Sequence, residues 1–269
     1  MPELPEVETI VRDLRQSLIG QTITGVEIYC ERSIATPSPA EFRAGLLGQR
    51  ILSVERRGKF IVLQLGQGYL LIHLRMTGQL LIVAAGEALS DRYLRVVLAF
   101  DGQRLLFRDV RKLGRLYLVA EASGVLGNLG PEPLGDDFTP EKLAECLGRR
   151  WGAIKSLLLD QSLLAGVGNI YADEALHSAR IAPQRQACTL TREEVTALYR
   201  AIRSELQRGI RNRGTTLSNY RDAAGREGEH REHLRVYGRA GEPCPRCGST
   251  IVRARIGGRS SFHCPHCQR

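Results

Sequence analysis

The chain begins Met1-Pro2-Glu3, so removal of Met1 would leave the secondary amine of Pro2 as a free N-terminal group. Such an amine has a reference pKa of about 7.7 to 8, far below that of lysine, and much of it is unprotonated near neutral pH. An unprotonated amine can attack an electrophilic carbon and form a covalent intermediate. Glu3 and Glu6 follow closely enough to act as acid and base. The first residues therefore predict covalent chemistry at an N-terminal proline.

Four of the seven cysteines form two CxxC pairs near the end of the chain, Cys244-Pro-Arg-Cys247 and Cys264-Pro-His-Cys267. Four thiolates at this spacing can close a tetrahedral zinc site in a β-hairpin ribbon. Because the protein fills all four positions, none is left for a substrate, and we predict one structural Zn²⁺. His263 and His266 could compete as ligands but would break the symmetry of the pairs. Cys30, Cys146 and Cys188 stand alone and are expected to be inert thiols.

Positive charge is concentrated near the zinc ligands. The chain has a formal net charge of +9, and residues 231–269 hold eight arginines against two acidic residues. A basic segment favours a polyanion partner, because each neutralised phosphate releases a counterion. Arginine-rich composition by itself could also reflect an ordinary solvated face. Between the cysteine pairs, however, Arg253, Arg255 and Arg259 surround Gly257 and Gly258, which predicts a basic hairpin tip able to approach a DNA backbone.

A second candidate phosphate site is the turn Gly166-Val-Gly168-Asn169. The two glycines allow a tight turn directly before a helix, and Asn169 would lie beside the free amides at the helix start. A GxGN turn alone is weak evidence. Its value lies in the longer stretch that contains it, from Leu157 to Glu174.

These three blocks, taken in order, resemble the bacterial formamidopyrimidine-DNA glycosylases, which remove oxidised purines from DNA. The stretch 157–174 is similar to that family's helix-two-turn-helix, and the resemblance covers essentially the whole chain. It implies a bifunctional glycosylase and AP lyase acting on 8-oxoguanine and formamidopyrimidines, with double-stranded DNA as partner. An endonuclease VIII-like enzyme for oxidised pyrimidines, or a non-catalytic zinc-ribbon protein that binds DNA, remains an alternative. The start Leu4-Pro5-Glu6-Val7 and Arg111 argue against the endonuclease VIII-like branch.

The resemblance implies catalytic roles at five positions. Pro2 would attack C1′ of the damaged nucleotide, Glu3 would move protons at the sugar, and Glu6 would support the same network. Lys59, in Arg56-Arg57-Gly58-Lys59-Phe60, matches the family's hairpin lysine near the reaction centre. Arg259 would act both there and on DNA.

The remaining roles that the resemblance implies concern DNA binding. His73, Asn169, Tyr237 and Arg259 match positions that contact phosphates. A base taken out of the duplex leaves a gap that must be filled.

The gap-filling residues would be Met76, Arg111 and Leu113. The family usually carries a phenylalanine where this chain has Leu113, which can wedge but cannot stack. The loop Ser218 to His230 corresponds to the family segment that covers the flipped base. The charged run 229–233, which overlaps the end of this loop and precedes Val236, stands where the family usually carries a phenylalanine.

Hydrophobic periodicity indicates the elements that must position these residues. Apolar residues at 7, 10, 11, 14 and 18 predict an amphipathic helix from Pro5 to Leu18. Short alternating runs predict eight strands: Thr22–Tyr29, Ile51–Glu55, Phe60–Leu65, Tyr69–Leu74, Gln79–Val83, Tyr93–Phe100, Arg104–Arg108 and Arg115–Val119. Helices are predicted further on: Pro140–Arg149, Ala153–Leu159, Asn169–Arg180 and Arg192–Arg211.

We therefore expect an α+β multidomain protein. Its predicted domains are an N-terminal antiparallel β-sandwich with a leading helix (1–133), a helical helix-two-turn-helix domain (134–220), and a lid-loop remnant with a β-hairpin zinc finger (221–269). The proline-interrupted stretch Leu129 to Leu134 is typical of a linker. The acidic N-terminus and the lack of a long apolar run predict a cytoplasmic, nucleoid-associated protein without a membrane partner, expected to be a monomer.

Overall fold

The computed structural model describes residues 1–148 and 150–269. The chain forms two compact units, each made of two segments. The first unit comprises Met1–Gly127 and Asn212–Arg231, and the second comprises Asn128–Arg211 and Glu232–Arg269. Each unit holds a separate set of the predicted functional residues.

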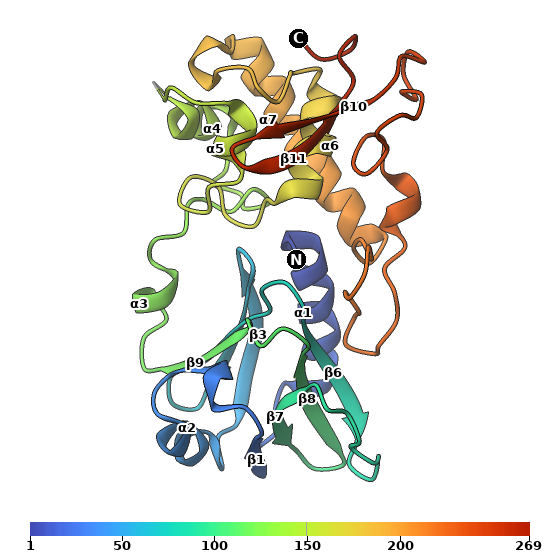
Figure 1. Cartoon of the computed structure of the whole chain (residues 1–269). Coiled ribbons are helices and arrows are strands. Elements are labelled where there is room, and N and C mark those ends of the chain that lie inside the picture. The colour runs from blue at the N-terminus through green and yellow to red at the C-terminus, as the bar shows by residue number, and fades with distance from the viewer. Residues whose placement is uncertain (149) are drawn as a thin grey trace. The chain divides into compact units, whose positions relative to one another are not determined.

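The first unit is a β-sandwich with a leading helix, as predicted (Figure 1). One sheet has the order β1-β7-β8-β6 and the other the order β2-β9-β5-β4-β3. Every pairing in these sheets is antiparallel except that of β2 with β9. The elements are α1 (Leu4–Leu18), β1 (Gly25–Ile28), η1 (Glu31–Ser33), β2 (Ile34–Thr36), α2 (Pro39–Leu46), β3 (Ile51–Arg57), β4 (Phe60–Leu65), β5 (Tyr69–His73), β6 (Gly78–Ala84), β7 (Leu94–Ala99), β8 (Gln103–Asp109), β9 (Arg115–Val119) and α3 (Ser123–Leu126).

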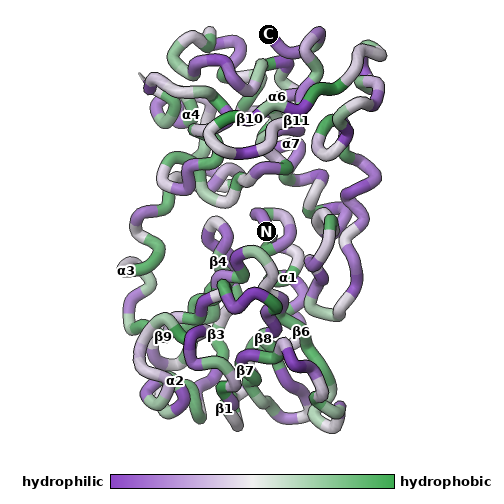
Figure 2. The backbone as a smooth tube through the Cα atoms, in the orientation of Figure 1, coloured by the Kyte–Doolittle hydropathy of each residue, from purple (hydrophilic) through white to green (hydrophobic). Residues whose placement is uncertain are grey.

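The main hydrophobic core of this unit joins α1 to both sheets. The residues of α1 at the predicted apolar positions, Val7, Ile10, Val11, Leu14 and Leu18, are fully buried in it. Hydrophobic residues recur along the strands that enclose this core (Figure 2). Burial of one large aliphatic side chain contributes about 1.5 to 3 kcal/mol, so this face of α1 fixes the helix firmly on the sandwich.

The eight predicted strands correspond to β1 and β3–β9, whereas β2 and α2 were missed. Helix α2 had a readable signal, because Ser38 and Glu41 form a capping box around Pro39 at its start. Strand β2 has only three residues and pairs in parallel with the distant β9, so no local pattern could indicate it.

The second unit is helical and carries the terminal hairpin. Its elements are α4 (Pro140–Leu147), α5 (Ile154–Leu158), α6 (Asn169–Ala179), η2 (Ala187–Thr189), α7 (Arg192–Arg211), β10 (Val252–Ile256) and β11 (Arg259–His263). The short helix η3 (His230–His233) spans the point where the chain re-enters this unit. Helix α4 stops at Leu147 because Gly148 has φ +38°, and the predicted helix end at Arg149 lies outside the described residues.

The boundaries of the two units differ from the predicted domain limits of 133/134 and 220/221. The first crossing falls after Gly127, and residues 212–231 return to the first unit. The proline-interrupted stretch is fixed within the second unit, because Gly130 N–H donates to Gln161 O and Ala165 N–H donates to Pro131 O. The three-domain division stays a prediction. In the described part of the chain, no helix combines the length and the apolar character that crossing a membrane requires.

The returning segment 212–231 is held to the first unit by ion pairs. Asp222, which is fully buried, accepts hydrogen bonds from the guanidinium groups of Arg213 and Arg226 and from the backbone N–H groups of Ala224 and Arg226. Arg213 also contacts Asp13 of α1 at 2.6 Å. These bonds lower the pKa of Asp222 against the opposing effect of its burial. The segment is therefore folded around one carboxylate.

Replacement of this carboxylate should loosen the segment. We expect Asp222→Asn to lower the free energy of unfolding by about 2 kcal/mol, because hydrogen bonds to a charged group each contribute about 1.5 to 3 kcal/mol. Amide hydrogen exchange in residues 214–228 should accelerate. The matched control is Glu227→Gln, which removes an exposed ion pair with Arg221 in the same segment and should cost less than about 0.5 kcal/mol. Equal effects of the two variants in urea unfolding would contradict this account.

Candidate active site and nucleic-acid interface

The N-terminal candidates are assembled at the first turn of α1. Pro2 is buried, and Glu3 and Glu6 form a capping box in which Glu3 N–H donates to Glu6 Oε2 at 2.8 Å. The other oxygen, Oε1, accepts the N–H of Thr215 at 2.7 Å. Glu6 is only 1% exposed. Its carboxylate therefore joins the backbone beside Pro2 to Thr215, three residues before the segment 218–230 that the family resemblance predicts to cover the flipped base.

Close approach at this point requires a glycine. Gly214 has φ +82°, and a Cβ placed there would lie 2.9 Å from Glu6 Cγ. An L-residue would be strained in this backbone conformation and would push on the Glu6 side chain. Tyr220, also buried, donates its hydroxyl hydrogen to Arg213 O at 3.0 Å and closes the other side of the turn.

Lys59 lies in the turn before β4, and His73 ends β5, the strand that pairs with β4. Gly58 and Lys59 form the two-residue turn between β3 and β4, with Gly58 at φ +57°. Phe60 is paired with His73 on β5, and their ring centroids are 4.6 Å apart. Lys59 is nearly buried at 6% exposure, which differs from a solvated surface lysine.

His73 is held in one neutral form. Burial, with the charges of Arg75 and Lys59, lowers the pKa of His73 to about 3. Its Nδ1 accepts the N–H of Arg75 at 3.1 Å, so the ring proton resides on Nε2. At neutral pH the imidazole can donate a hydrogen bond but adds no positive charge to the surface.

Met76, Arg111 and Leu113 occur on two loops that one carboxylate ties together. Asp109, fully buried at the end of β8, accepts a hydrogen bond from the Thr77 hydroxyl and another from Arg111 N–H. Its Oδ2 accepts the N–H groups of Leu113 and Gly114, each at 2.7 Å. Arg111 and Met76 are exposed and Leu113 is half-buried. The predicted gap-filling residues thus share one rigid support.

Asn169 and Tyr237 are brought together in the second unit. Asn169, the first residue of α6, donates from Nδ2 to the Tyr237 hydroxyl at 3.3 Å. Glu174, fully buried on the same helix, accepts the backbone N–H groups of residues 235, 236 and 237 at 2.9 to 3.0 Å. Burial raises the pKa of Glu174 and these three donors oppose the rise.

Arg259 is placed by the hairpin β10-β11, which lies against α6 (Figure 1). Lys155 and Asp173 form a fully buried ion pair at 2.8 Å under this hairpin. Lys155 Nζ donates to Ser260 O, and Phe262 N–H donates to Asp173 Oδ2. Arg259 starts β11 directly after the Gly257-Gly258 turn and is exposed. The basic tip is therefore anchored through the backbone of its own strand.

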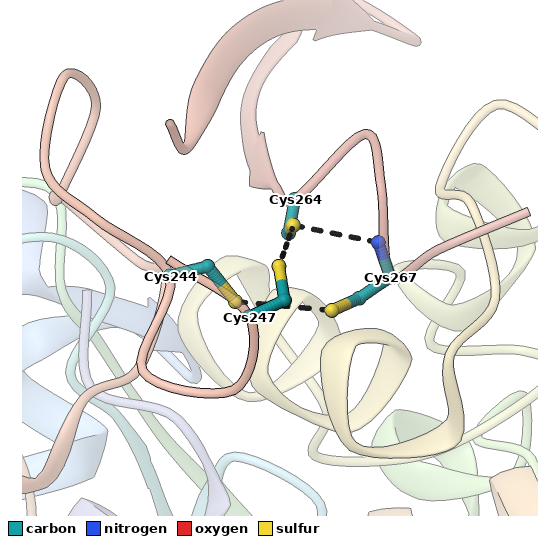
Figure 3. Close-up of side chains that lie close together, drawn as sticks. All are labelled: Cys244, Cys247, Cys264 and Cys267. Carbon is teal, nitrogen blue, oxygen red and sulfur yellow. Dashed lines mark hydrogen bonds between the residues drawn. The ribbon is translucent and has the colours of Figure 1, made fainter. Parts of the chain in front are cut away.

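The four paired cysteines converge at the base of the hairpin (Figure 3). All four sulfur atoms lie within 4.8 Å of one another. Cys247 and Cys264 sulfurs are 3.5 Å apart, and Cys244 and Cys267 sulfurs are 4.0 Å apart. A tetrahedral zinc with bonds of about 2.3 Å separates its sulfurs by about 3.8 Å, so the residues fit one Zn²⁺. Neither His263 nor His266 belongs to the cluster.

Sequence reasoning missed the residues that support the site: Asp109, Asp173, Glu174, Asp222 and Lys155. The sequence offered one indication of these roles, the adjacent acids Asp173 and Glu174 among the apolar residues of α6. An acid on a buried helix face needs a hydrogen-bond or ionic partner. Lys155 is one of only four lysines in the chain. The partners of these residues are remote in sequence, so their roles could not be read locally.

In chemical terms, the first unit offers a buried proline beside two carboxylates, a lysine in the β3–β4 turn and a neutral histidine on β5. The second offers a zinc-braced basic hairpin with an Asn–Tyr pair. Three family profiles match in succession: the formamidopyrimidine-DNA glycosylase N-terminal domain over residues 1–116, its H2TH domain over 129–221, and the zinc finger found in FPG and IleRS over 241–269. The chain belongs to the formamidopyrimidine-DNA glycosylase family.

Relatives support this membership over the full length. A formamidopyrimidine-DNA glycosylase of Pelotomaculum thermopropionicum is 50% identical, covering 100% of this chain and 99% of the relative. A formamidopyrimidine-DNA glycosylase of Chloroflexus aurantiacus is 51% identical, covering 100% of this chain and 98% of the relative. Among solved structures, a Lactococcus lactis FPG mutant in complex with Fapy-dG DNA has a TM-score of 0.93 at 34% identity and covers 100% of both chains. The Lactococcus lactis Fpg in complex with abasic-site DNA has a TM-score of 0.92 at 34% identity and covers 99% of both.

Asp109 offers a direct test of how the loops are supported. In Asp109→Asn an NH₂ group replaces one carboxylate oxygen. The two hydrogen-bond donors that contacted this oxygen then face another donor and lose their acceptor. Each lost partner should cost about 1 to 3 kcal/mol. We expect lower stability and faster hydrogen exchange at residues 110–114. Asp101 is an exposed acid in the β7–β8 turn. The control Asp101→Asn should leave both the stability and the hydrogen exchange at residues 110–114 unchanged. Unaltered exchange at residues 110–114 would show that the loops are held by other contacts.

Proposed function

We propose that this chain is a base-excision-repair DNA glycosylase and AP lyase, with the amine of Pro2 as its nucleophile. The proposed substrates are 8-oxoguanine and formamidopyrimidines in double-stranded DNA, together with abasic sites. The observation that carries the proposal is the placement of Pro2 directly before Glu3 and Glu6 at the first turn of α1. The family membership and the solved complexes of relatives with Fapy-dG and abasic DNA support it.

The proposed reaction follows from the properties of a secondary amine. The nitrogen of Pro2 loses its proton and bonds to C1′, the glycosidic bond breaks, and the base leaves with a proton. Opening of the sugar breaks the bond from C1′ to O4′, which takes up a proton, and gives an iminium. An iminium on proline has no N–H to lose, so it keeps its charge and acidifies the C2′ proton. Loss of that proton drives β-elimination and then δ-elimination of the flanking phosphates.

The two carboxylates take different parts in this proposal. Glu3, as the N-cap residue beside Pro2, exchanges protons with O4′ of the sugar. Glu6 has both oxygens engaged by backbone N–H groups, so it positions Glu3 and the returning segment at Thr215 rather than transferring protons itself. Lys59 lies 6% exposed at the β3–β4 turn, and its place is near the DNA at the reaction centre.

Recognition of the lesion falls to the exposed loops of the first unit. Met76, Arg111 and Leu113 fill the space left by the flipped nucleotide. An aliphatic Leu113 fills volume without stacking on an unpaired base, whereas an aromatic residue would recover about 1 to 3 kcal/mol of stacking. His73 contributes a neutral hydrogen-bond donor to a phosphate.

The second unit supplies grip on the DNA backbone through Asn169, Tyr237 and Arg259. Zinc, when bound by the four cysteines, supplies a structural cross-link. The chain's own residues then hold the tip, because the Lys155–Asp173 pair fixes the strand that carries Arg259. A cytoplasmic monomer that works on the nucleoid completes the proposal.

Trapping with borohydride tests the nucleophile. We expect the protein lacking Met1 to be trapped on a duplex containing 8-oxoguanine, because reduction of the iminium makes the bond permanent. Glu3→Gln should slow base release by about 10² to 10⁴, and Pro2→Gly should also slow it strongly while DNA binding persists. The matched control is Pro5→Ala, which keeps the Pro2 amine and should still be trapped.

A form with an added N-terminal residue blocks the amine of Pro2 in an amide and should not be trapped. Undiminished trapping of that form would contradict the assignment of the nucleophile. Equal or faster release of an oxidised pyrimidine such as thymine glycol would contradict the purine preference.

A further inference from the structure

A buried histidine of α6 contacts a cysteine of the zinc cluster. His177 Nε2 lies 3.4 Å from Cys244 Sγ, and the two residues are 1% and 2% exposed. His177 is not one of the four clustered ligands. The contact joins the helix that begins with Asn169 to the knuckle 244–247, which belongs to a distant part of the sequence.

The surroundings of the ring decide which nitrogen carries the proton. His177 Nδ1 is buried and has no hydrogen-bond partner among the described residues. A proton on Nδ1 would leave a buried N–H donor unpaired and would point the Nε2 lone pair at the sulfur. A proton on Nε2 satisfies the donor and leaves only an acceptor unpaired, which costs less. The geometry therefore favours an Nε2–H···Sγ hydrogen bond.

The backbone of the same residue holds the same knuckle. Arg246 Nη1 donates to His177 O at 2.9 Å, and Arg246 Nη2 approaches Ser178 O at 3.4 Å. These carbonyls lie at the C-terminal end of α6, where a cation is favoured by the helix dipole. The knuckle is thus attached to α6 by two independent contacts, one of them directed at a zinc ligand.

We propose that His177 is a positioning residue for the zinc site, which donates a hydrogen bond from Nε2 to the zinc-bound thiolate of Cys244. Four thiolates around one Zn²⁺ leave a net negative charge, and a buried N–H donor directed at sulfur stabilises it. The bond withdraws electron density from that sulfur and fixes its direction, as partners of metal ligands generally do. Because the inference concerns the zinc site alone, it stands or falls independently of glycosylase activity.

The first measurement is the rate at which the zinc-loaded protein gives up its metal to excess of a chromophoric chelator. We expect His177→Phe, which keeps bulk but removes the donor, to release zinc about 10-fold faster. His177→Gln places an amide N–H near the position of Nε2 and should restore most of the slow release. The exposed His233 of the same unit provides the control His233→Gln, expected to match the wild type.

The outcomes separate hydrogen bonding from packing. Fast release in His177→Phe with rescue in His177→Gln supports the proposal, whereas equally fast release in both variants shows that the ring acts through packing alone and overturns it. Unchanged release in His177→Phe also overturns it. If the Phe variant does not fold, the tautomer in the zinc-loaded wild type decides: long-range ¹H–¹⁵N correlation should show the proton on Nε2, and a proton on Nδ1 would refute the hydrogen bond.

Discussion

The arrangement of the first unit depends on one buried carboxylate, that of Glu6. It receives the N–H of Glu3 at one oxygen and the N–H of Thr215 at the other, across most of the length of the chain. Glu6 lies in the first turn of α1, where the helix dipole stabilises the negative charge of its carboxylate. This bridge holds the backbone beside Pro2 directly against the start of the returning segment.

Buried carboxylates that accept backbone N–H groups also support three other loops. Asp109 gathers the backbone N–H groups of residues 111, 113 and 114, Glu174 gathers those of 235 to 237, and Asp222 gathers those of 224 and 226. Each carboxylate is fully buried and accepts hydrogen bonds from backbone N–H groups of the loop that it supports. Because these acids are buried and bonded to the backbone, they form no ion pair with the exposed Arg111 and Arg259 among the described residues. Those arginines remain available to a polyanion.

Patterns that are local in sequence could be predicted, and remote pairings could not. The apolar face of α1, the eight strands and the four clustered cysteines follow from spacing alone, and the structure confirms them. Helix α2 was missed although Ser38 and Glu41 mark its start. The return of residues 212–231 to the first unit rests on the contacts of Arg213 with Asp13 and of Thr215 with Glu6, which no local periodicity reveals. His177 could be placed on a helix, but its contact with Cys244 needed the fold.

The proposed covalent centre is the amine of Pro2, held in place by the carboxylates that follow it. Peptide mapping of the borohydride-reduced complex tests this claim most directly. After nuclease and protease digestion, mass spectrometry should find the sugar remnant on the N-terminal peptide that starts at Pro2, with fragment ions that assign it to the proline nitrogen. A remnant on the peptide that contains Lys59, with an unmodified N-terminal peptide, would contradict it.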